Sequence, residues 1–364
     1  MSYPDQFQGF MINELGKHQD FKKQSFKPKV FGDNDVDIKI ECCGVCGSDV
    51  HTITGGWGEA PTPICVGHEV VGKAIKVGSQ VKDVKVGDRV GVGAQVWSCL
   101  KCPNCKNDNE NYCPHMVDTY GAPYPKEADP DETISQGGFS SHIRAHEYFV
   151  FPIPDAIPSH LAAPMLCAGL TTYSPLVRAG VGPGKQVAIV GLGGLGHFGV
   201  MWANALGAEV TVISHSPNKK DDALKLGAKH FVSSGDKDWA KPLAFKFDFV
   251  LNTADMTHTF DMSAYLSTLK VGCQFHQVGM PDGAIQDFKM QQFMPNGSSI
   301  GASHIGNRPE CLAMLKLAAE KKLHPMVETV PISEKGCAEV ADRVNNNKVH
   351  YRFTLVDFDK AFGA

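Results

Sequence analysis

The chain has 364 residues, of which 43% are hydrophobic and 20% are charged, and these proportions exclude a mainly disordered protein. The formal net charge of −4, from 35 basic and 39 acidic residues, indicates neither a nucleic-acid-binding face nor a polybasic membrane anchor. At roughly 150 residues per domain, the length predicts about two domains.

The chain starts with MSYPDQ, which lacks the charged and then apolar order of a secretory signal. No stretch approaches the ~18 consecutive apolar residues of a membrane span. We therefore expect a cytoplasmic protein that binds neither membrane nor nucleic acid. In such a chain, twelve cysteines favour metal binding or chemistry over a disulfide framework.

The predicted elements change in kind along the chain. Up to about residue 150, short β-branched runs such as 70–78 and 88–92 end in glycine turns, which predicts a β-rich, barrel-like domain. A helical stretch at 161–179 follows. Strands predicted at 186–190, 210–213, 230–232, 248–251 and 274–278 then alternate with helices, including 221–226 and 260–269. This alternation predicts a doubly wound parallel sheet, before a last helix at 309–321 and strand at 351–356.

Four cysteines lie close together at Cys99, Cys102, Cys105 and Cys113. This spacing lets a loop fold around one zinc ion and fill its tetrahedral shell, so the pattern predicts a structural site that admits no substrate. The alternatives are two disulfides, an iron–sulfur cluster and a nucleic-acid zinc module. The expected cytoplasmic compartment argues against disulfides, and the polar surroundings argue against an iron–sulfur cluster. The modest local charge argues against a nucleic-acid zinc module.

A second group of metal-ligand residue types lies in segments 42–51 and 67–72, which read CCGVCGSDVH and GHEVVG. Thiolate and imidazole ligands on adjacent short strands suit a zinc ion with one open position. Each residue alone is more often a packed side chain than a ligand.

Together, these segments and the cysteine loop resemble the zinc-containing medium-chain dehydrogenase/reductase superfamily. The signature GHE-x2-G-x5-G-x2-V is met at every position from Gly67 to Val81. Segments 44–51 and 164–171 are similar to the cinnamyl alcohol dehydrogenase branch, and within it to the broad-specificity NADPH-dependent alcohol dehydrogenases of yeasts. The match runs from Cys46 to Arg352.

The resemblance implies that Cys46, His68 and Cys167 bind a catalytic zinc ion. Glu69 would be a nearby carboxylate that can replace water as the fourth ligand. Asp49 would orient His68 through a hydrogen bond, a device that the physics of metal sites favours in any case.

The resemblance also implies a proton path in which Ser48 carries the reacting proton and passes it to His51 through the cofactor ribose. The alternative for His51 is a surface histidine. Four further residues are candidates for the wall of the substrate pocket, with core packing as the alternative for each: Trp57, Trp97, Met116 and Tyr120.

A glycine cluster follows the strand predicted at 186–190 and precedes a helix. It fits the fingerprint Gly-x-Gly-x-x-Gly and consists of Gly191, Leu192, Gly193, Gly194, Leu195 and Gly196. In that context, the glycines let the backbone approach a pyrophosphate whose charge lies at the helix N-terminus.

The end of the second strand indicates which dinucleotide binds. An NAD site has Asp or Glu about 20 residues after the glycines, whereas this chain has Ser214, His215 and Ser216, followed by Lys219 and Lys220. Hydroxyls and lysines favour a 2′-phosphate and hence NADP. The alternative for the lysines is a solvated helix start, although cations there oppose the helix dipole.

By resemblance, Thr171, Val278, Ser299 and Ile300 line the nicotinamide side, and Arg352 contacts the phosphates. A zinc ion and NADP(H) in one chain predict hydride transfer between the cofactor and a small-molecule aldehyde or primary alcohol. Cinnamyl-type aromatic and medium-chain compounds are the expected substrates. A polyol dehydrogenase and a non-catalytic NADPH-binding protein are the alternatives.

The expected fold class is α/β, with two domains. A GroES-like, β-rich catalytic domain with both zinc sites takes residues 1–160 and 307–364. A Rossmann, doubly wound NADP-binding domain takes residues 161–306. The resemblance also implies a homodimer.

Overall fold

The computed structural model describes residues 5–256, 260–283 and 288–363. The chain forms two units, the first from Met1–Cys167 together with Asn307–Ala364, and the second from Ala168–Gly306. The sequence predicts that the boundaries between the two units lie at residues 160/161 and 306/307. In the structure these boundaries lie at 167/168 and 306/307.

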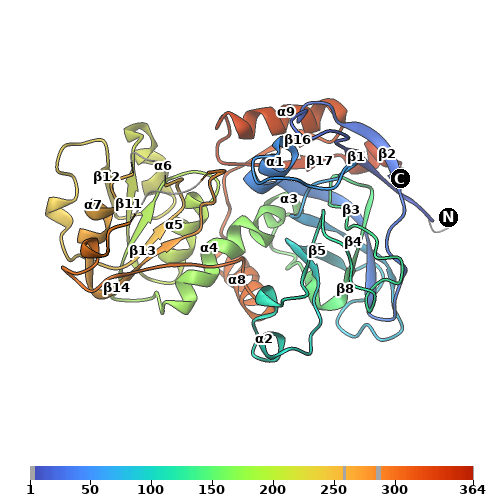
Figure 1. Ribbon diagram of the computed structural model, residues 1–364, viewed down its shortest axis with the longest axis horizontal. Helices are drawn as coiled ribbons and strands as arrows, with labels where there is room; N and C mark the ends of the chain where they lie inside the picture. Colours follow the sequence, from blue (N-terminus) through green and yellow to red (C-terminus); the bar gives the residue numbers. More distant parts are fainter. Residues whose placement is uncertain (1–4, 257–259, 284–287, 364) are drawn as a thin grey trace. The chain divides into compact units, whose positions relative to one another are not determined.

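A seven-stranded sheet forms the centre of the first unit (Figure 1). Its order is β16-β17-β3-β4-β5-β9, and β8 also pairs with β3. Only the β16–β17 pair is parallel. The bounds are β3 (Asp35–Val45), β4 (Val70–Val77), β5 (Arg89–Val92), β8 (His142–His146), β9 (Val150–Pro152), β16 (Val327–Pro331) and β17 (Arg352–Val356).

Two small sheets and several helices complete the first unit. The small sheets pair β1 (Phe7–Met11) with β2 (Lys22–Phe26), and β6 (Gln95–Trp97) with β7 (Val117–Asp118). The helices are α1 (Gly47–Thr54), α2 (Pro103–Lys106), α3 (Ser159–Ala162), α8 (Arg308–Lys321), α9 (Glu334–Asn345) and α10 (Phe358–Phe362), with 3-10 turns at Glu110–Tyr112, Glu147–Phe149 and Ala163–Leu166.

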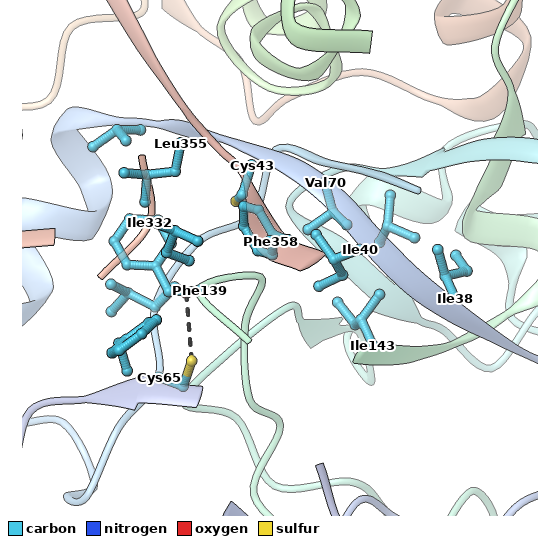
Figure 2. Packing of buried hydrophobic residues seen from close by; sticks show 14 of the residues in the cluster. Ile38, Ile40, Cys43, Cys65, Val70, Phe139, Ile143, Ile332, Leu355 and Phe358 are labelled. Carbon is cyan, nitrogen blue, oxygen red and sulfur yellow. Dashed lines mark hydrogen bonds between the residues drawn. The ribbon is translucent and has the colours of Figure 1, made fainter. Parts of the chain in front are cut away.

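The core of the first unit joins both ends of the chain. Ile38 and Ile40 of β3 pack near Ile143 of β8 in the same cluster as Leu355 and Phe358 from the returning segment (Figure 2). Each is at most 2% exposed. Because burial of such side chains supplies most of the stabilising free energy, the returning segment is a structural part of this unit.

A six-stranded parallel sheet with the order β12-β11-β10-β13-β14-β15 forms the second unit. Its strands are β10 (Gln186–Val190), β11 (Glu209–Ser214), β12 (His230–Ser233), β13 (Phe247–Asn252), β14 (Leu269–Gln277) and β15 (Ser299–Ala302). Its helices are α4 (Ala168–Arg178), α5 (Gly196–Ala205), α6 (Lys220–Lys225) and α7 (Met262–Ser267), with 3-10 turns at Pro217–Lys219, Lys241–Leu243 and Met290–Gln292. The predicted fold class, a GroES-like domain and a Rossmann-type sheet, is confirmed.

Two predicted boundaries in the second unit are wrong. The helix predicted at 260–269 begins at Met262 and ends at Ser267, and the strand predicted at 274–278 begins at Leu269. Leu269 already pairs with Phe247 of β13, and an irregularity follows in the ladder before Gln274. None of the helices in the described part of the chain combines the length and the apolar character that a bilayer crossing requires.

Candidate active site

Four potential ligand atoms converge in the first unit. Those of Cys46, His68, Glu69 and Cys167 all lie within 4.8 Å of one another, and all four residues are buried. Cys46 is the N-cap of α1, His68 and Glu69 directly precede β4, and Cys167 follows the 3-10 turn Ala163–Leu166. The sheet therefore brings together residues that are 121 positions apart in the chain.

Asp49 organises this cluster. Its carboxylate, 1% exposed, lies 2.9 Å from Nδ1 of His68 and accepts hydrogen bonds from the backbone N–H groups of Cys46 and Gly67 at 2.8 and 3.0 Å. Because Nδ1 is occupied, Nε2 is the imidazole atom that faces the cluster, 3.1 Å from Sγ of Cys167. Histidines that bind a metal commonly have such a hydrogen-bond partner on the other ring nitrogen, and here that partner is Asp49.

The electrostatics of the cluster fit a dication. A hydrogen bond from the Cys167 thiol holds the pKa of Cys46 well below its usual value, and the thiolate is the form that binds zinc. Burial raises the pKa of Glu69 to about 7, although Arg352 opposes this shift. Two thiols, one imidazole and a carboxylate are donors that zinc accepts, so the residues present fit a catalytic zinc ion.

Glu69 and Arg352 form a buried ion pair beside these donors. Their side chains are 0% and 5% exposed. Space for Glu69 depends on Gly44, because a Cβ there would lie 2.0 Å from Oε2 of Glu69. The sequence did not indicate this ion pair. Contact between Arg352 and a phosphate stays a prediction, although its Nε has no hydrogen-bond partner in the described residues.

The predicted proton-path residues lie on α1. Oγ of Ser48 is 3.6 Å from Sγ of Cys46. His51, one turn further along, stacks on Trp57 with ring centroids 4.8 Å apart and planes 15° from parallel.

The other three candidates for the pocket wall differ in their surroundings. The ring of Tyr120 lies 5.6 Å from that of His68, next to the metal ligands. Trp97, 8% exposed, belongs to the hydrophobic core of the first unit. Met116 donates its backbone N–H to the carbonyl of Cys113 in the cysteine loop. Substrate contact by Trp97 or Met116 stays a prediction.

The four-cysteine loop has the geometry of a tetrahedral thiolate site. The Sγ–Sγ distances are 3.5 Å for Cys102–Cys105, 3.9 Å for Cys102–Cys113 and 3.5 Å for Cys99–Cys113. Zn–S bonds of ~2.3 Å give tetrahedron edges of about 3.8 Å. All twelve cysteines, each within the described residues, are free, which excludes the disulfide alternative. These residues fit a structural zinc ion.

An unpredicted contact holds this loop to the returning segment. Glu110, 2% exposed, accepts the backbone N–H of Arg308 at 2.5 Å, and the Asn307 side chain donates to the carbonyl of Asp108 at 2.7 Å. The loop therefore fixes the point at which the chain re-enters the first unit.

The glycine fingerprint lies between β10 and α5 in the second unit. Gly191 has φ +83°, which side chains rarely adopt, and a Cβ on Gly196 would lie 2.1 Å from the carbonyl oxygen of Gly191. A Cβ on Gly193 would meet nothing within 4 Å. Gly191 thus allows the tight turn, and Gly196 allows the close packing of strand and helix. Gly193 leaves space through which a pyrophosphate can approach the backbone.

The residues predicted for the 2′-phosphate follow β11. Ser214 is buried, whereas His215 is exposed. Lys219 donates from Nζ to the carbonyl of Leu192 at 2.7 Å, and burial lowers its pKa. The lysine therefore reaches the glycine loop instead of projecting into solvent, which fits a phosphate next to that loop.

Three of the predicted nicotinamide residues lie on or directly beside strands β14 and β15. In parallel sheets of this kind the ligand binds outside the carboxyl ends of the strands. Val278 follows that end of β14, but Ser299 and Ile300 pair with Gln274 and Phe275 at the amino end of β15. Ser303 directly follows the carboxyl end of β15, and contact of Ser299 and Ile300 with the nicotinamide stays a prediction.

Ser303 also contacts its neighbouring strand, since its Oγ lies 2.9 Å from Nε2 of His276. Thr171, the remaining nicotinamide candidate, is half-buried on α4.

Comparisons with known proteins agree with this geometry. Residues 32–155 match the alcohol dehydrogenase GroES-like domain, and residues 194–320 match the zinc-binding dehydrogenase domain. The NADP-dependent alcohol dehydrogenase 6 of Saccharomyces cerevisiae is 46% identical over 367 residues, which cover 100% of this chain and 99% of that protein.

Solved structures of cinnamyl alcohol dehydrogenases are similar throughout. The enzyme from Sorghum bicolor has a TM-score of 0.89 at 36% identity, with 96% of this chain and 97% of that chain covered. The enzyme from Helicobacter pylori, solved with NADP(H), has a TM-score of 0.87 at 33% identity, with 96% and 98% covered.

Proposed function

The chain belongs to the zinc-containing medium-chain dehydrogenase/reductase superfamily, in its cinnamyl alcohol dehydrogenase-like branch, and is an NADP-dependent alcohol dehydrogenase; we propose that it reduces aromatic, cinnamyl-type and medium-chain aldehydes. The observation that carries the proposal is the buried cluster of Cys46, His68 and Cys167, with Asp49 fixed on the far side of the imidazole. The second unit adds an NADP-type glycine loop.

When bound, zinc supplies Lewis acidity toward the carbonyl oxygen and NADPH supplies the hydride. Asp49 keeps Nε2 of His68 directed at the metal position. Ser48 donates a proton to the oxygen of the nascent alcohol and recovers it from His51. Arg352 compensates the charge of Glu69 in a site that excludes water from both side chains.

Two observations support the substrate class. NADP dependence favours the reductive direction, since this cofactor is commonly the one used for reduction. Tyr120 lies next to His68, so an aromatic ring beside the metal ligands is available to a cinnamyl ring.

The test is a comparison of kcat/KM for NADPH-dependent reduction of cinnamaldehyde, hexanal and acetaldehyde, together with NADP⁺-dependent oxidation of sorbitol and mannitol. Cinnamaldehyde and hexanal should exceed acetaldehyde by at least tenfold, and the polyols should be poor substrates. Polyol oxidation without aldehyde reduction would support the polyol dehydrogenase alternative. No turnover despite bound zinc and NADPH would support a non-catalytic role.

We also propose a cytoplasmic homodimer that forms through the second unit. Among the described residues, its edge strand β15 pairs only with β14, and exposed apolar side chains lie in and before it, at Met290, Met294 and Ile300. Exposed edges and apolar patches of this kind commonly pair with a second chain. Sedimentation equilibrium should give twice the chain mass, whereas a monomer at micromolar concentration would contradict the proposal.

A further inference from the structure

His51 and Trp57 form a nearly parallel ring stack in the first unit. The centroids are 4.8 Å apart and the planes differ by 15°. His51 is half-buried, whereas the side chain of Trp57 is 41% exposed. Among the described residues, no other tryptophan is as exposed. Core burial therefore does not explain where this indole lies, and its contact with the imidazole needs an explanation of its own.

The local backbone is built to produce this stack. Helix α1 ends at Thr54, and Gly55 follows in the left-handed conformation with φ +76°. The N–H of Gly56 donates to the carbonyl of His51 at 2.9 Å. Gly58, with φ +104°, continues the turn. Because glycine adopts such angles without strain, the chain folds back and places Trp57 against the last helical turn.

We propose that Trp57 is a positioning residue for the proton transfer, acting through His51 and not as a wall of the substrate pocket. This inference rests on the role of His51 in the proposed function. The imidazole of His51, half-buried in the last turn of α1, is attached through two rotatable torsions, χ1 and χ2. The flat face of an indole restricts the imidazole to one plane, and proton transfer depends on that orientation.

The two roles of Trp57 predict different kinetics. A residue that orients His51 changes kcat, acts equally on small and large aldehydes, and has no effect once His51 is absent. A pocket wall changes KM, acts mainly on bulky aldehydes, and keeps its effect without His51. A double-mutant cycle separates these cases.

The kinetic experiment uses the zinc-loaded full chain with NADPH and compares wild type, Trp57→Ala, Trp57→Phe, His51→Gln and the double variant Trp57→Ala/His51→Gln. Trp57→Ala should lower kcat about three- to tenfold for cinnamaldehyde and hexanal alike, with KM nearly unchanged. Trp57→Phe, which keeps an aromatic face, should recover most of the loss. In the His51→Gln background, Trp57→Ala should have no further effect. Phe245→Ala, which removes another exposed aromatic side chain, is the matched control.

A second measurement is independent of turnover. In ¹H–¹³C spectra of histidine-labelled protein, the ring protons of His51, identified by their absence in His51→Gln, should be shifted upfield by the indole face. Trp57→Ala should remove this shift, and Trp57→Phe should keep part of it. If the ring protons of His51 keep their upfield shift in Trp57→Ala, the stack itself is overturned.

Four kinetic results overturn the inference. Equal effects of Trp57→Ala in both backgrounds, or an effect confined to the KM of cinnamaldehyde, assign Trp57 to the pocket. An unchanged kcat in Trp57→Ala with a lowered kcat in His51→Gln shows that the stack is not needed for proton transfer. If His51→Gln has wild-type kcat, the proposed proton path fails first, and the inference about Trp57 fails with it.

Discussion

The carboxylate of Asp49 lies 2.9 Å from Nδ1 of His68, which leaves Nε2 facing the thiols of the metal cluster. The same carboxylate accepts backbone hydrogen bonds from Cys46 and Gly67. One buried side chain thus sets the orientation of one metal ligand and the backbone at another. Its replacement should weaken metal binding without removing any ligand.

Asp49→Asn should lower the affinity of the catalytic site for zinc about 10- to 100-fold, because the amide supplies a weaker partner to the imidazole. Zinc content after dialysis against graded chelator concentrations measures this change. Asp155→Asn, at a fully exposed carboxylate, is the control. Wild-type retention of both zinc ions in Asp49→Asn would contradict the role assigned to Asp49.

Cys105→Ser should remove the structural zinc ion while the Cys46 cluster keeps its own. The contacts of Glu110 with Arg308 would then lose their support, and the melting temperature should fall by roughly 5 °C or more. Cys273→Ser removes a thiol outside both clusters and serves as the control. An unchanged melting temperature together with the loss of one zinc ion would show that the loop does not stabilise the fold.

Lys219→Ala should raise the KM for NADPH by roughly tenfold or more, because it removes a charged hydrogen-bond donor from the 2′-phosphate. The KM for NADH should change little. Lys220→Ala, at the exposed neighbour, should have a smaller effect. Parallel steady-state kinetics with both cofactors measure the difference, and an equal rise for NADPH and NADH would rule out a specific phosphate contact.

His276 should make the fold sensitive to acid. Burial lowers its pKa from 6.5 to about 4, so between these values the unfolded chain binds a proton that the folded chain does not. The free energy of unfolding therefore falls as the pH decreases from about 6.5 to about 4. In His276→Gln, the loss between pH 7.5 and pH 5 should be smaller by about 1–2 kcal/mol.

Denaturant titrations of wild type and His276→Gln at the two pH values measure this difference, and the acid release of zinc affects both proteins alike. Identical losses in the two proteins would show that His276 titrates normally in the folded state.

The sequence predicted what depends on local pattern. The Cys99–Cys113 spacing, the Gly191–Gly196 fingerprint and the alternation of strands and helices are contained in short segments, and each is confirmed as a feature of the fold. Contacts between distant segments leave no such trace. The pair Glu69–Arg352 joins residues 283 positions apart, and Gly44 gives no sign in the sequence of the space that it leaves for Glu69.

The register of β15 shows why short strands are hard to place. Its four residues, Ser299–Ala302, include only one β-branched side chain, so no alternation marks where the strand starts. Only pairing with β14 fixes its carboxyl end. Strand β16 and helix α9 were likewise not predicted, because burial against the first unit, as at Cys337 and Val340, determines their positions.

The central claim is that Cys46, His68 and Cys167 hold the zinc ion required for NADPH-dependent aldehyde reduction. The most direct measurement is NADPH consumption with cinnamaldehyde, beside NADH, for wild type, Cys46→Ser and the control Cys273→Ser, with zinc content determined for each. Wild type and control should hold two zinc ions per chain, one for each cluster, and oxidise NADPH far faster than NADH. Cys46→Ser should lose one zinc ion and nearly all activity. Wild-type turnover by Cys46→Ser, or its retention of both zinc ions, would contradict the account.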